Sequence, residues 1–415
     1  MDDLVSRFPE RSAIAVQIGN NEQWPALLLA LFRRGLVPVP VGRHVEAAEL
    51  QRSLEMCGTA ALILNEGGVM KVEKQPHRVI RHTCEFLKLT SGTTSAPRAV
   101  RFKAVQLLAD CDQICATMGI TDRDLNFGVI PFSHSYGFSN LVTPLICRGV
   151  PLVASEDRMP RAILHGLAAS RATVFPGMPV FYDKLSALEG ESLSDLRLCI
   201  SAGAPLPKAV AEAFTKRFGK KIHTFYGSSE CGGIGYDASL AALYEDGFAG
   251  TPMQKVDVQQ EPGEGMQRII VRSAAVADGY FPEEEPAVLD GGRFIPGDLV
   301  QWENRGMFIA GRVSDTINIA GRKLNPAEIE GRLSSFPGIR QVVVFGVPSA
   351  LRGEEPVACV AGEGIDRTAL LRFCQQELSQ WQIPRDFWIV DEIPANERGK
   401  ISRRVLAERF AGRGE

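Results

Sequence analysis

The sequence lacks three features that would place it in a narrow class: paired cysteines, a long apolar run and an excess of one charge. Its nine cysteines stand singly with no CxxC pair, which argues against a disulfide framework and against a structural zinc site. Its apolar stretches fall far short of the ~18 residues of a membrane span, and the N-terminus has no apolar signal core. We therefore expect a cytoplasmic protein without a membrane span.

The charge balance names no macromolecular partner. Lys and Arg total 46 against 49 Asp and Glu, and no long run of one sign stands out. Because nucleic-acid-binding proteins usually carry a basic excess, we expect no nucleic-acid partner. The length of 415 residues and the hydrophobic content of 45% indicate a globular chain of more than one domain.

Helix-then-strand patterns repeat along the first 245 residues. Amphipathic helices are predicted at 24–34, 47–56, 161–170 and 208–218, each followed by a short apolar strand. This alternation predicts layered α/β subdomains with a largely parallel sheet. After about residue 250 short strands with Gly, Pro and Asp turns predict a small antiparallel β subdomain, either a sheet or a distorted barrel.

In the last hundred residues the sequence pattern predicts a compact α+β domain, with a helix at 326–335, two strands and a second helix at 368–378. The predicted organisation is therefore α/β, with a large N-terminal domain at 1–312 and a small C-terminal domain at 313–415. Within the N-terminal domain, 1–245 forms the α/β layers and 246–312 the β-rich subdomain.

The strongest local signal is the segment TSGTTSAPR, from Thr90 to Arg98, which follows a strand-like FLKL. Its hydroxyl groups, backbone N–H groups and terminal cation suit a polyphosphate. On composition alone a flexible Ser/Thr linker explains it equally well. It is not a Walker loop, because GxxxxGK[ST] is absent.

At long range this segment is followed by SAGAP, YGSSE, PGD, GRVSDTINIAGRKL and NERGK. In this order the motifs resemble those of the acyl-adenylate-forming superfamily, which includes acyl- and aryl-CoA synthetases, the adenylation domains of nonribosomal peptide synthetases and beetle luciferase. The resemblance implies ATP and Mg²⁺ as cofactors, formation of an acyl-AMP from a small carboxylic acid, transfer of the acyl group to a thiol, and a mobile C-terminal domain.

The resemblance also implies where the nucleotide binds. The phosphate contacts implied are Thr90, Ser91, Gly92, Thr93, Thr94 and Arg98. The implied contacts to adenine, the α-phosphate and ribose are Gly203, Ala204, Pro205, Tyr226, Gly227, Ser229, Asp298 and Arg312. Glu230 is implied as the metal-associated carboxylate. Ser95 and Arg98 replace the glycine and lysine that the family usually has, and Ser95 could restrict the mobility of the loop.

Catalytic roles are implied for Lys400, Glu230 and His134. The ammonium of Lys400 would offset negative charge as the acyl-adenylate forms; without the motif it would be an ordinary exposed lysine. The hinge of the family is implied at Ser314, which replaces the usual Asp or Lys, or at Asp315 next to it. Gly321 is implied at the channel for the thiol.

The resemblance places the acid pocket at His134, Ser135, Tyr136, Gly137 and Gly203, with His134 as its gate. Relatives that activate α-amino acids keep an Asp where this chain has Ser135. A substrate ammonium would remain unpaired there, so an α-amino acid is disfavoured. Aromatic residues in the segments expected to line the pocket, such as Phe132, Phe138 and Phe175, favour an aryl or medium-chain acyl acid.

Several alternatives stay open at this level. The acceptor thiol could be CoA or the phosphopantetheine of a carrier protein. A non-catalytic nucleotide-binding scaffold is a further alternative, suggested by Ser95 and Ser314, although retention of Lys400 and Glu230 argues against it. The phosphate loop begins earlier than in typical relatives, so we expect a shortened N-terminal subdomain, completed by a partner or by a homodimer contact.

Overall fold

The computed structural model describes residues 5–90, 97–263, 266–349, 351–394 and 401–413. The chain divides into two compact units. The N-terminal unit comprises Met1–Glu261, Ile269–Pro296 and Glu303–Met307, and the C-terminal unit comprises Pro262–Arg268, Gly297–Trp302 and Phe308–Glu415. This division by packing assigns residues 308–312 to the C-terminal unit; the domain boundary at 312/313 stays a prediction.

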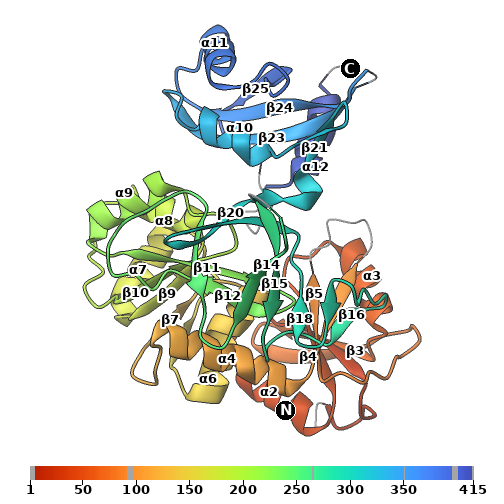
Figure 1. Ribbon diagram of the computed structural model, residues 1–415. Coiled ribbons are helices and arrows are strands. Elements are labelled where there is room, and N and C mark those ends of the chain that lie inside the picture. The colour runs from red at the N-terminus through yellow and green to blue at the C-terminus, as the bar shows by residue number, and fades with distance from the viewer. Residues whose placement is uncertain (1–4, 91–96, 264–265, 350, 395–400, 414–415) are drawn as a thin grey trace. The chain divides into compact units, whose positions relative to one another are not determined.

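A parallel sheet opens the N-terminal unit, with strand order β2-β1-β3-β4 and β4 returning antiparallel to β3 (Figure 1). The elements are β1 (Ala13–Gln17), α2 (Trp24–Arg33), β2 (Val37–Pro40), α3 (Ala47–Cys57), β3 (Ala61–Glu66) and β4 (Val69–Lys74). Strand β2 reads VPVP and lies at the sheet edge, where a missing N–H costs no ladder bond.

The central sheet of this unit runs in the order β13-β12-β11-β10-β9-β7-β8 (Figure 1). From β11 through β8 the strands are parallel, whereas β12 and β13 are antiparallel. Its strands are β7 (Asn126–Gly128), β8 (Leu152–Ala154), β9 (Val174–Gly177), β10 (Leu198–Ser201), β11 (Ile222–Ser228), β12 (Gly232–Tyr236) and β13 (Phe248–Pro252). Strands β9 and β10 are buried throughout, as expected of a parallel sheet covered on both faces.

Helices connect these strands. They are α4 (Ala104–Met118), α5 (Ser135–Gly137), the π-helix η1 (Phe138–Val142), α6 (Thr143–Arg148), α7 (Pro160–Ser170), α8 (Pro179–Ser186) and α9 (Lys208–Phe218). Helix α9 has the predicted bounds. The α/β class with a largely parallel sheet is confirmed.

Two smaller sets of strands complete this part of the fold. The set that carries the ends of the phosphate loop is β5 (Phe86–Thr90), β6 (Arg98–Phe102) and β16 (Gly279–Phe281). The β-rich segment holds β14 (Asp257–Gln260), β15 (Gln267–Arg272), β17 (Leu289–Asp290) and β18 (Arg293–Phe294). It also holds β19 (Asp298–Glu303) and β20 (Gly306–Arg312), which belong for the most part to the C-terminal unit. The pairs of β15 with β14 and β18 are antiparallel, as the short turn-rich strands predict.

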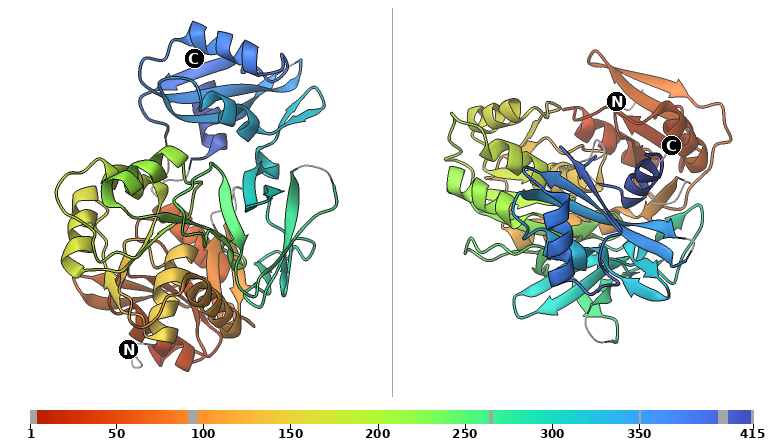
Figure 2. Two further views of the ribbon diagram at one scale, coloured as in Figure 1. Left: turned by 60° about the vertical axis from the view of Figure 1, so that its left-hand side comes forward. Right: turned by 90° about the horizontal axis from the view of Figure 1, so that it is seen from above.

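The C-terminal unit is an α+β fold with helices on both faces of its sheet (Figure 2). Its elements are the 3₁₀ turn η2 (Val313–Asp315), β21 (Ile317–Ile319), β22 (Arg322–Leu324), α10 (Pro326–Leu333), β23 (Ile339–Ser349), β24 (Gly353–Gly362), α11 (Arg367–Glu377), β25 (Asp386–Val390) and α12 (Arg403–Ala411). Along β23, Val342 and Val344 pack with α10 and α11, whereas Val343 and Phe345 pack with Leu406 of α12. The alternation of strand side chains thus builds two cores.

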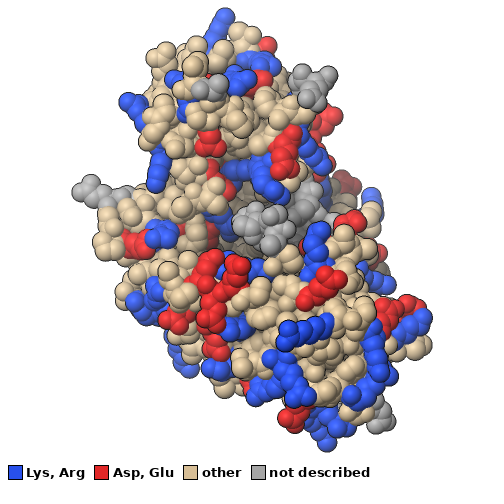
Figure 3. Space-filling model, turned by 90° about the vertical axis from the view of Figure 1, so that its right-hand side faces the viewer, with Lys and Arg blue, Asp and Glu red and all other residues tan. Residues whose placement is uncertain are grey.

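On the face drawn in Figure 3, basic and acidic side chains of the described residues are interspersed. Within the described part of the chain, every helix is too short or too polar to cross a bilayer.

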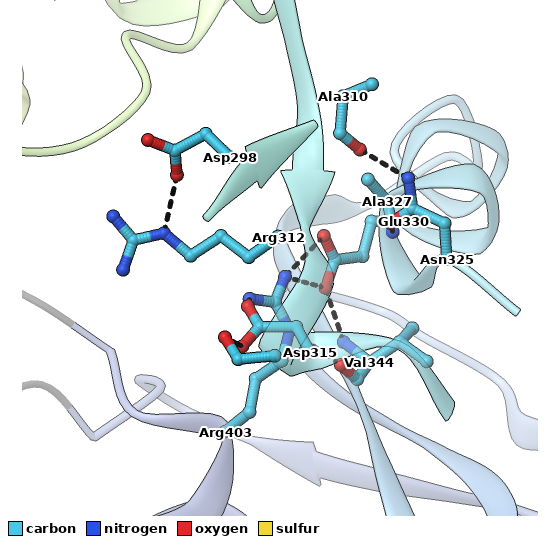
Figure 4. A network of polar contacts seen from close by, with 10 residues as sticks. Asp298, Ala310, Arg312, Asp315, Asn325, Ala327, Glu330, Val344 and Arg403 are labelled. Carbon is cyan, nitrogen blue, oxygen red and sulfur yellow. Dashed lines mark hydrogen bonds and ion pairs between the residues drawn. The ribbon is translucent and has the colours of Figure 1, made fainter. Parts of the chain in front are cut away.

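An ion-pair network ties α12 to the start of the C-terminal unit (Figure 4). The guanidinium of Arg403 contacts Glu330 at 2.8 Å and also pairs with Asp315, and its Nε donates to the carbonyl of Val344 at 2.9 Å. All three charged side chains are less than a third exposed. Removing one partner would therefore leave opposite charges poorly solvated.

Arg403→Met should lower the local free energy of unfolding of the C-terminal unit by about 2 kcal/mol, because Glu330 and Asp315 lose their cation. Native-state hydrogen exchange of the β23 amides measures the change. Arg404→Met is the matched control, since its pair with Glu408 is exposed and should contribute less than about 0.5 kcal/mol. Equal effects of the two variants would contradict a structural role for the network.

Candidate active site

The hairpin β5–β6 brings the two ends of the predicted phosphate loop together. Thr90 is the register partner of Arg98, and its hydroxyl donates to the Arg98 carbonyl at 3.3 Å. The loop itself lies outside the described residues, and with it the predicted contacts Ser91, Gly92, Thr93 and Thr94 and the replacement Ser95. The structure thus describes the two stems of this loop.

Arg98 is held by an aromatic ring and a carboxylate. The carbon at the centre of its guanidinium lies 3.2 Å from the centre of the Tyr280 ring, and one of its nitrogens lies 3.1 Å from Glu285. A guanidinium over an aromatic face is attracted by the ring quadrupole. The cation at the end of the loop therefore has a defined place on β16.

The hydroxyl of the same tyrosine is hydrogen-bonded to Glu230. The Tyr280 hydroxyl donates to Oε1 of Glu230 at 3.1 Å, and the Ser228 hydroxyl donates to Oε2. Burial first and the Glu230 carboxylate second raise the pKa of Tyr280, so its hydroxyl stays a donor. The ring thus joins Arg98 and Glu230, which are far apart in the sequence.

Sequence reasoning missed Tyr280. The residue lies in DGYF on β16, and its position is set by antiparallel pairing with β6, where Tyr280 is the partner of Val100. No local spacing connects it with YGSSE, since its bond to Glu230 spans fifty positions of the chain. An aromatic residue after glycine in a short strand is its only local signal.

The residue after the predicted acid gate is hydrogen-bonded to the nucleotide motif. His134 is the N-terminal cap of α5, where its Nδ1 accepts from the Tyr136 N–H at 3.3 Å. The next residue, Ser135, donates its hydroxyl to that of Ser229 at 2.8 Å. Two segments predicted separately, one for the acid and one for the α-phosphate, are therefore adjacent in the structure.

Tyr136 anchors this helix to the central sheet. Its hydroxyl is shared between the carbonyls of Gly177 at 3.3 Å and Ile200 at 3.1 Å, and burial raises its pKa. The side chain is only 7% exposed, so it offers little surface to a substrate. At Gly137 an added Cβ would lie 2.1 Å from the Pro131 carbonyl oxygen, which explains the glycine.

The remaining residues predicted to contact adenine lie in the segment after β10 and at the end of β11. Gly203 has φ of +85° in an exposed turn shared with Ala204 and Pro205. At Gly227, next to a β-bulge, an added Cβ would lie 2.6 Å from a carbonyl oxygen of β12. Tyr226 is 7% exposed, so most of its ring is buried in the protein.

Three further predicted residues belong to the C-terminal unit. Asp298 begins β19 and Arg312 ends β20, and their side chains form an ion pair at 2.7 Å (Figure 4). The carboxylate is the more buried of the two. Lys400 lies outside the described residues.

The predicted hinge and thiol-channel residues also belong to this unit. Ser314 and Asp315 lie in η2, where the Ser314 hydroxyl donates to Asp315 at 3.2 Å, and Asp315 also pairs with Arg403. Gly321 lies in the turn between β21 and β22 with φ of +85°, and its N–H donates to Asn318 at 3.1 Å. Their roles as hinge and channel stay predictions.

A buried lysine lies on β5, one of the two stems of the phosphate loop. The ammonium of Lys88, on β5, lies 4.6 Å from the centre of the Phe102 ring and 5.7 Å from that of Phe138. Burial lowers the pKa of Lys88 from 10.5, although the nearby carboxylates of Asp110 and Glu230 favour its charged form. Sequence reasoning did not single it out, because FLKL reads as an ordinary strand.

Comparison with known proteins decides the family. Residues 70–281 match the family model of AMP-binding enzymes, and residues 328–400 match that of the AMP-binding enzyme C-terminal domain. The chain belongs to the AMP-binding enzyme family. The predicted resemblance to acyl-adenylate-forming enzymes is thereby confirmed.

Relatives of this AMP-binding enzyme carry names of CoA ligases. A long-chain-fatty-acid–CoA ligase of Bacillus subtilis is 31% identical over 79% of this chain and 62% of its own length. A feruloyl-CoA synthase of an Amycolatopsis species is 27% identical over 93% of this chain and 87% of its own length. The chain therefore spans less than two thirds of the first of these relatives.

Solved structures show the same fold. The ATP-bound MatB of Rhodopseudomonas palustris has a TM-score of 0.86 at 22% identity, covering 100% of this chain and 92% of that one. The o-succinylbenzoate CoA synthetase of Bacillus subtilis has a TM-score of 0.82 at 21% identity, covering 98% and 90%. This AMP-binding enzyme therefore has the fold of both.

Lys88 predicts a pH dependence of stability. In the folded protein the pKa of Lys88 is below 10.5, so the unfolded chain binds this proton more tightly than the folded protein does. The contribution of Lys88 to the free energy of unfolding therefore rises with pH up to about pH 10.5. Lys88→Met fills the space without a titrating group. The stability of the wild type relative to this variant should therefore increase from pH 7 to pH 9.5 in urea unfolding.

The exposed Lys74→Met, measured in parallel, corrects for the loss of one positive charge. A wild-type advantage that stays constant or shrinks over this pH range would contradict the burial of a titrating ammonium at Lys88.

Proposed function

We propose that this enzyme joins a carboxylic acid to coenzyme A in two steps. In the first step a carboxylate oxygen attacks the α-phosphorus of ATP, the bond to the bridging oxygen breaks, and pyrophosphate leaves. In the second step the thiol of coenzyme A loses its proton and attacks the acyl carbonyl, and AMP leaves with the oxygen that the acid supplied. The products are an acyl-CoA, AMP and pyrophosphate.

The observation that carries this proposal is the group formed by Arg98, Tyr280 and Glu230 at the loop stem. A triphosphate needs cations and hydrogen-bond donors around its oxygens. Arg98 supplies a cation at one end of the loop, and Glu230 supplies an oxygen anion oriented by two hydroxyls. Thr90 to Thr94 and Arg98 are the proposed phosphate contacts.

Mg²⁺ is the proposed metal, and Glu230 is the residue that would hold it. Hard divalent cations take carboxylate oxygens, and both oxygens of Glu230 accept hydrogen bonds from neutral hydroxyls. When bound, the ion would neutralise charge on the phosphates.

Further roles follow from the motifs. We assign the ribose to Asp298 and Arg312, whose ion pair fixes the orientation of the carboxylate. The adenine and α-phosphate are assigned to the turns at Gly203–Pro205 and Tyr226–Ser229, and charge stabilisation during adenylate formation to Lys400. Ser314 or Asp315 is the proposed hinge, and Gly321 lines the proposed thiol channel.

The acceptor and the acid complete the proposed reaction. Relatives named as CoA ligases support coenzyme A as the acceptor. For the acid we propose an aryl or medium-chain acyl compound, bound near His134, Ser135 and Gly203. Phe132, Phe138 and Phe175 are at most 2% exposed, so these rings do not support the class. The relative named feruloyl-CoA synthase supports an aryl acid, and the one named long-chain-fatty-acid–CoA ligase supports an acyl acid. Location in the cytoplasm and a homodimer stay predictions.

Exchange of labelled pyrophosphate into ATP, run over a panel of aryl and acyl acids without thiol, tests the first step. We expect exchange that requires a particular acid and Mg²⁺. Lys400→Ala should slow it by about 10² or more, because a developing negative charge loses its cation.

Lys216→Ala, on α9, is the matched control and should exchange at the wild-type rate. No exchange with any acid would favour the non-catalytic scaffold, whereas full exchange by Lys400→Ala would remove the assigned role of this lysine.

A further inference from the structure

In the loop between β1 and α2, all polar groups of the Asn20 side chain form hydrogen bonds. Their partners lie in the segment 128–132, which begins at the end of β7, and at Ser155, just after the neighbouring strand β8. The amide nitrogen of Asn20 donates to the carbonyls of Gly128 at 3.0 Å, Ile130 at 3.0 Å and Ser155 at 2.9 Å. Its oxygen accepts from the N–H of Phe132 at 2.8 Å. An amide has two N–H groups, so three acceptors saturate its donors.

The backbone of this loop is fixed from the other side. Gly19 has φ of +68°, and a Cβ added there would lie 1.8 Å from an oxygen of Glu156. That oxygen accepts from the Asn20 N–H at 3.0 Å, and the second carboxylate oxygen pairs with Arg43. The asparagine therefore has little freedom to turn away from its partners.

The bonded segment leads directly to the acid gate. Pro131 lies between the two bonded residues Ile130 and Phe132, and its carbonyl accepts a hydrogen bond from the His134 N–H at 3.0 Å. The same carbonyl oxygen lies so near Gly137 that an added Cβ there would clash with it. The His134 ring in turn caps α5. Three of the four hydrogen bonds of Asn20 thus fall within the six residues before His134.

We propose that Asn20 is a positioning residue for acid binding, acting through the segment 128–137. It fixes the backbone from which His134 and Ser135 project, so that these side chains meet the substrate carboxylic acid in one orientation. The inference rests on the proposed function, because it takes the acid as the ligand whose binding depends on an ordered segment 128–137.

Asn20→Ala removes all four side-chain bonds and tests the proposal with two readouts. Hydrogen exchange of the peptide 129–138 should accelerate about tenfold or more, with the rest of the protein unchanged. The KM for the acid should rise about tenfold while the KM for ATP changes less than about twofold, because the displaced segment carries His134 and Ser135 and reaches the nucleotide motif only through the Ser135–Ser229 hydrogen bond. Gln17→Ala is the matched control, since it removes an amide that donates at 2.8 Å to Gly42, outside this segment.

Exchange that rises throughout the N-terminal unit, or KM values that rise together for both substrates, would reduce Asn20 to a general stabilising residue and overturn the proposal. Unchanged exchange at 129–138 would overturn it as well. If Asn20→Ala does not fold, Asn20→Ser keeps one donor and should show the same pattern at smaller amplitude. Were the wild type inactive with every acid, the proposed function would fail by itself, and the exchange comparison would still decide whether Asn20 orders this segment.

Discussion

The candidate site depends on parallel strands that end together. Because β9, β10 and β11 run in the same direction, the turns that follow them lie at one edge of the central sheet. Tyrosine hydroxyls bind the carbonyls near these ends: Tyr136 contacts Gly177 and Ile200, and Tyr182 contacts Ile200 and Phe175. The strand ends are thereby held in register, and the turns bearing Gly203 and Glu230 follow from them.

Neutral side chains link several of the predicted site residues to one another. Tyr280 contacts Arg98 with its ring and Glu230 with its hydroxyl, so the cation and the anion share one neighbour. The hydrogen bond between Ser135 and Ser229 likewise joins the segment of the predicted acid pocket to the nucleotide motif. Such links leave the carboxylate and the guanidinium less neutralised by each other than a direct ion pair would. Arg98 has its own carboxylate partner, Glu285, at 3.1 Å.

Short-range patterns in the sequence predict the features that depend on them. Apolar periodicity places α2, α3, α7 and α9 to within a residue or so, and the order of the motifs along the chain indicates the family. Tyr280 and Asn20 are not predictable in this way, because their hydrogen bonds join segments distant in the chain and their neighbours show no repeating pattern. Tyr136 shows the opposite case: its place beside the gate is expected, but its hydroxyl is bound by the backbone, which no spacing could reveal. The expected roles of Lys400 and of Ser91 to Thr94 concern residues outside the described part of the chain.

The proposed attack of the acid on the α-phosphorus of ATP can be followed by transfer of an oxygen isotope. The enzyme would be given its preferred acid labelled with ¹⁸O in the carboxylate, together with ATP, Mg²⁺ and coenzyme A, and the products would be analysed by mass spectrometry. We expect one ¹⁸O atom in AMP and none in pyrophosphate. Label in inorganic phosphate with ADP as the nucleotide product would contradict it, because the attack would then have occurred at the terminal phosphorus.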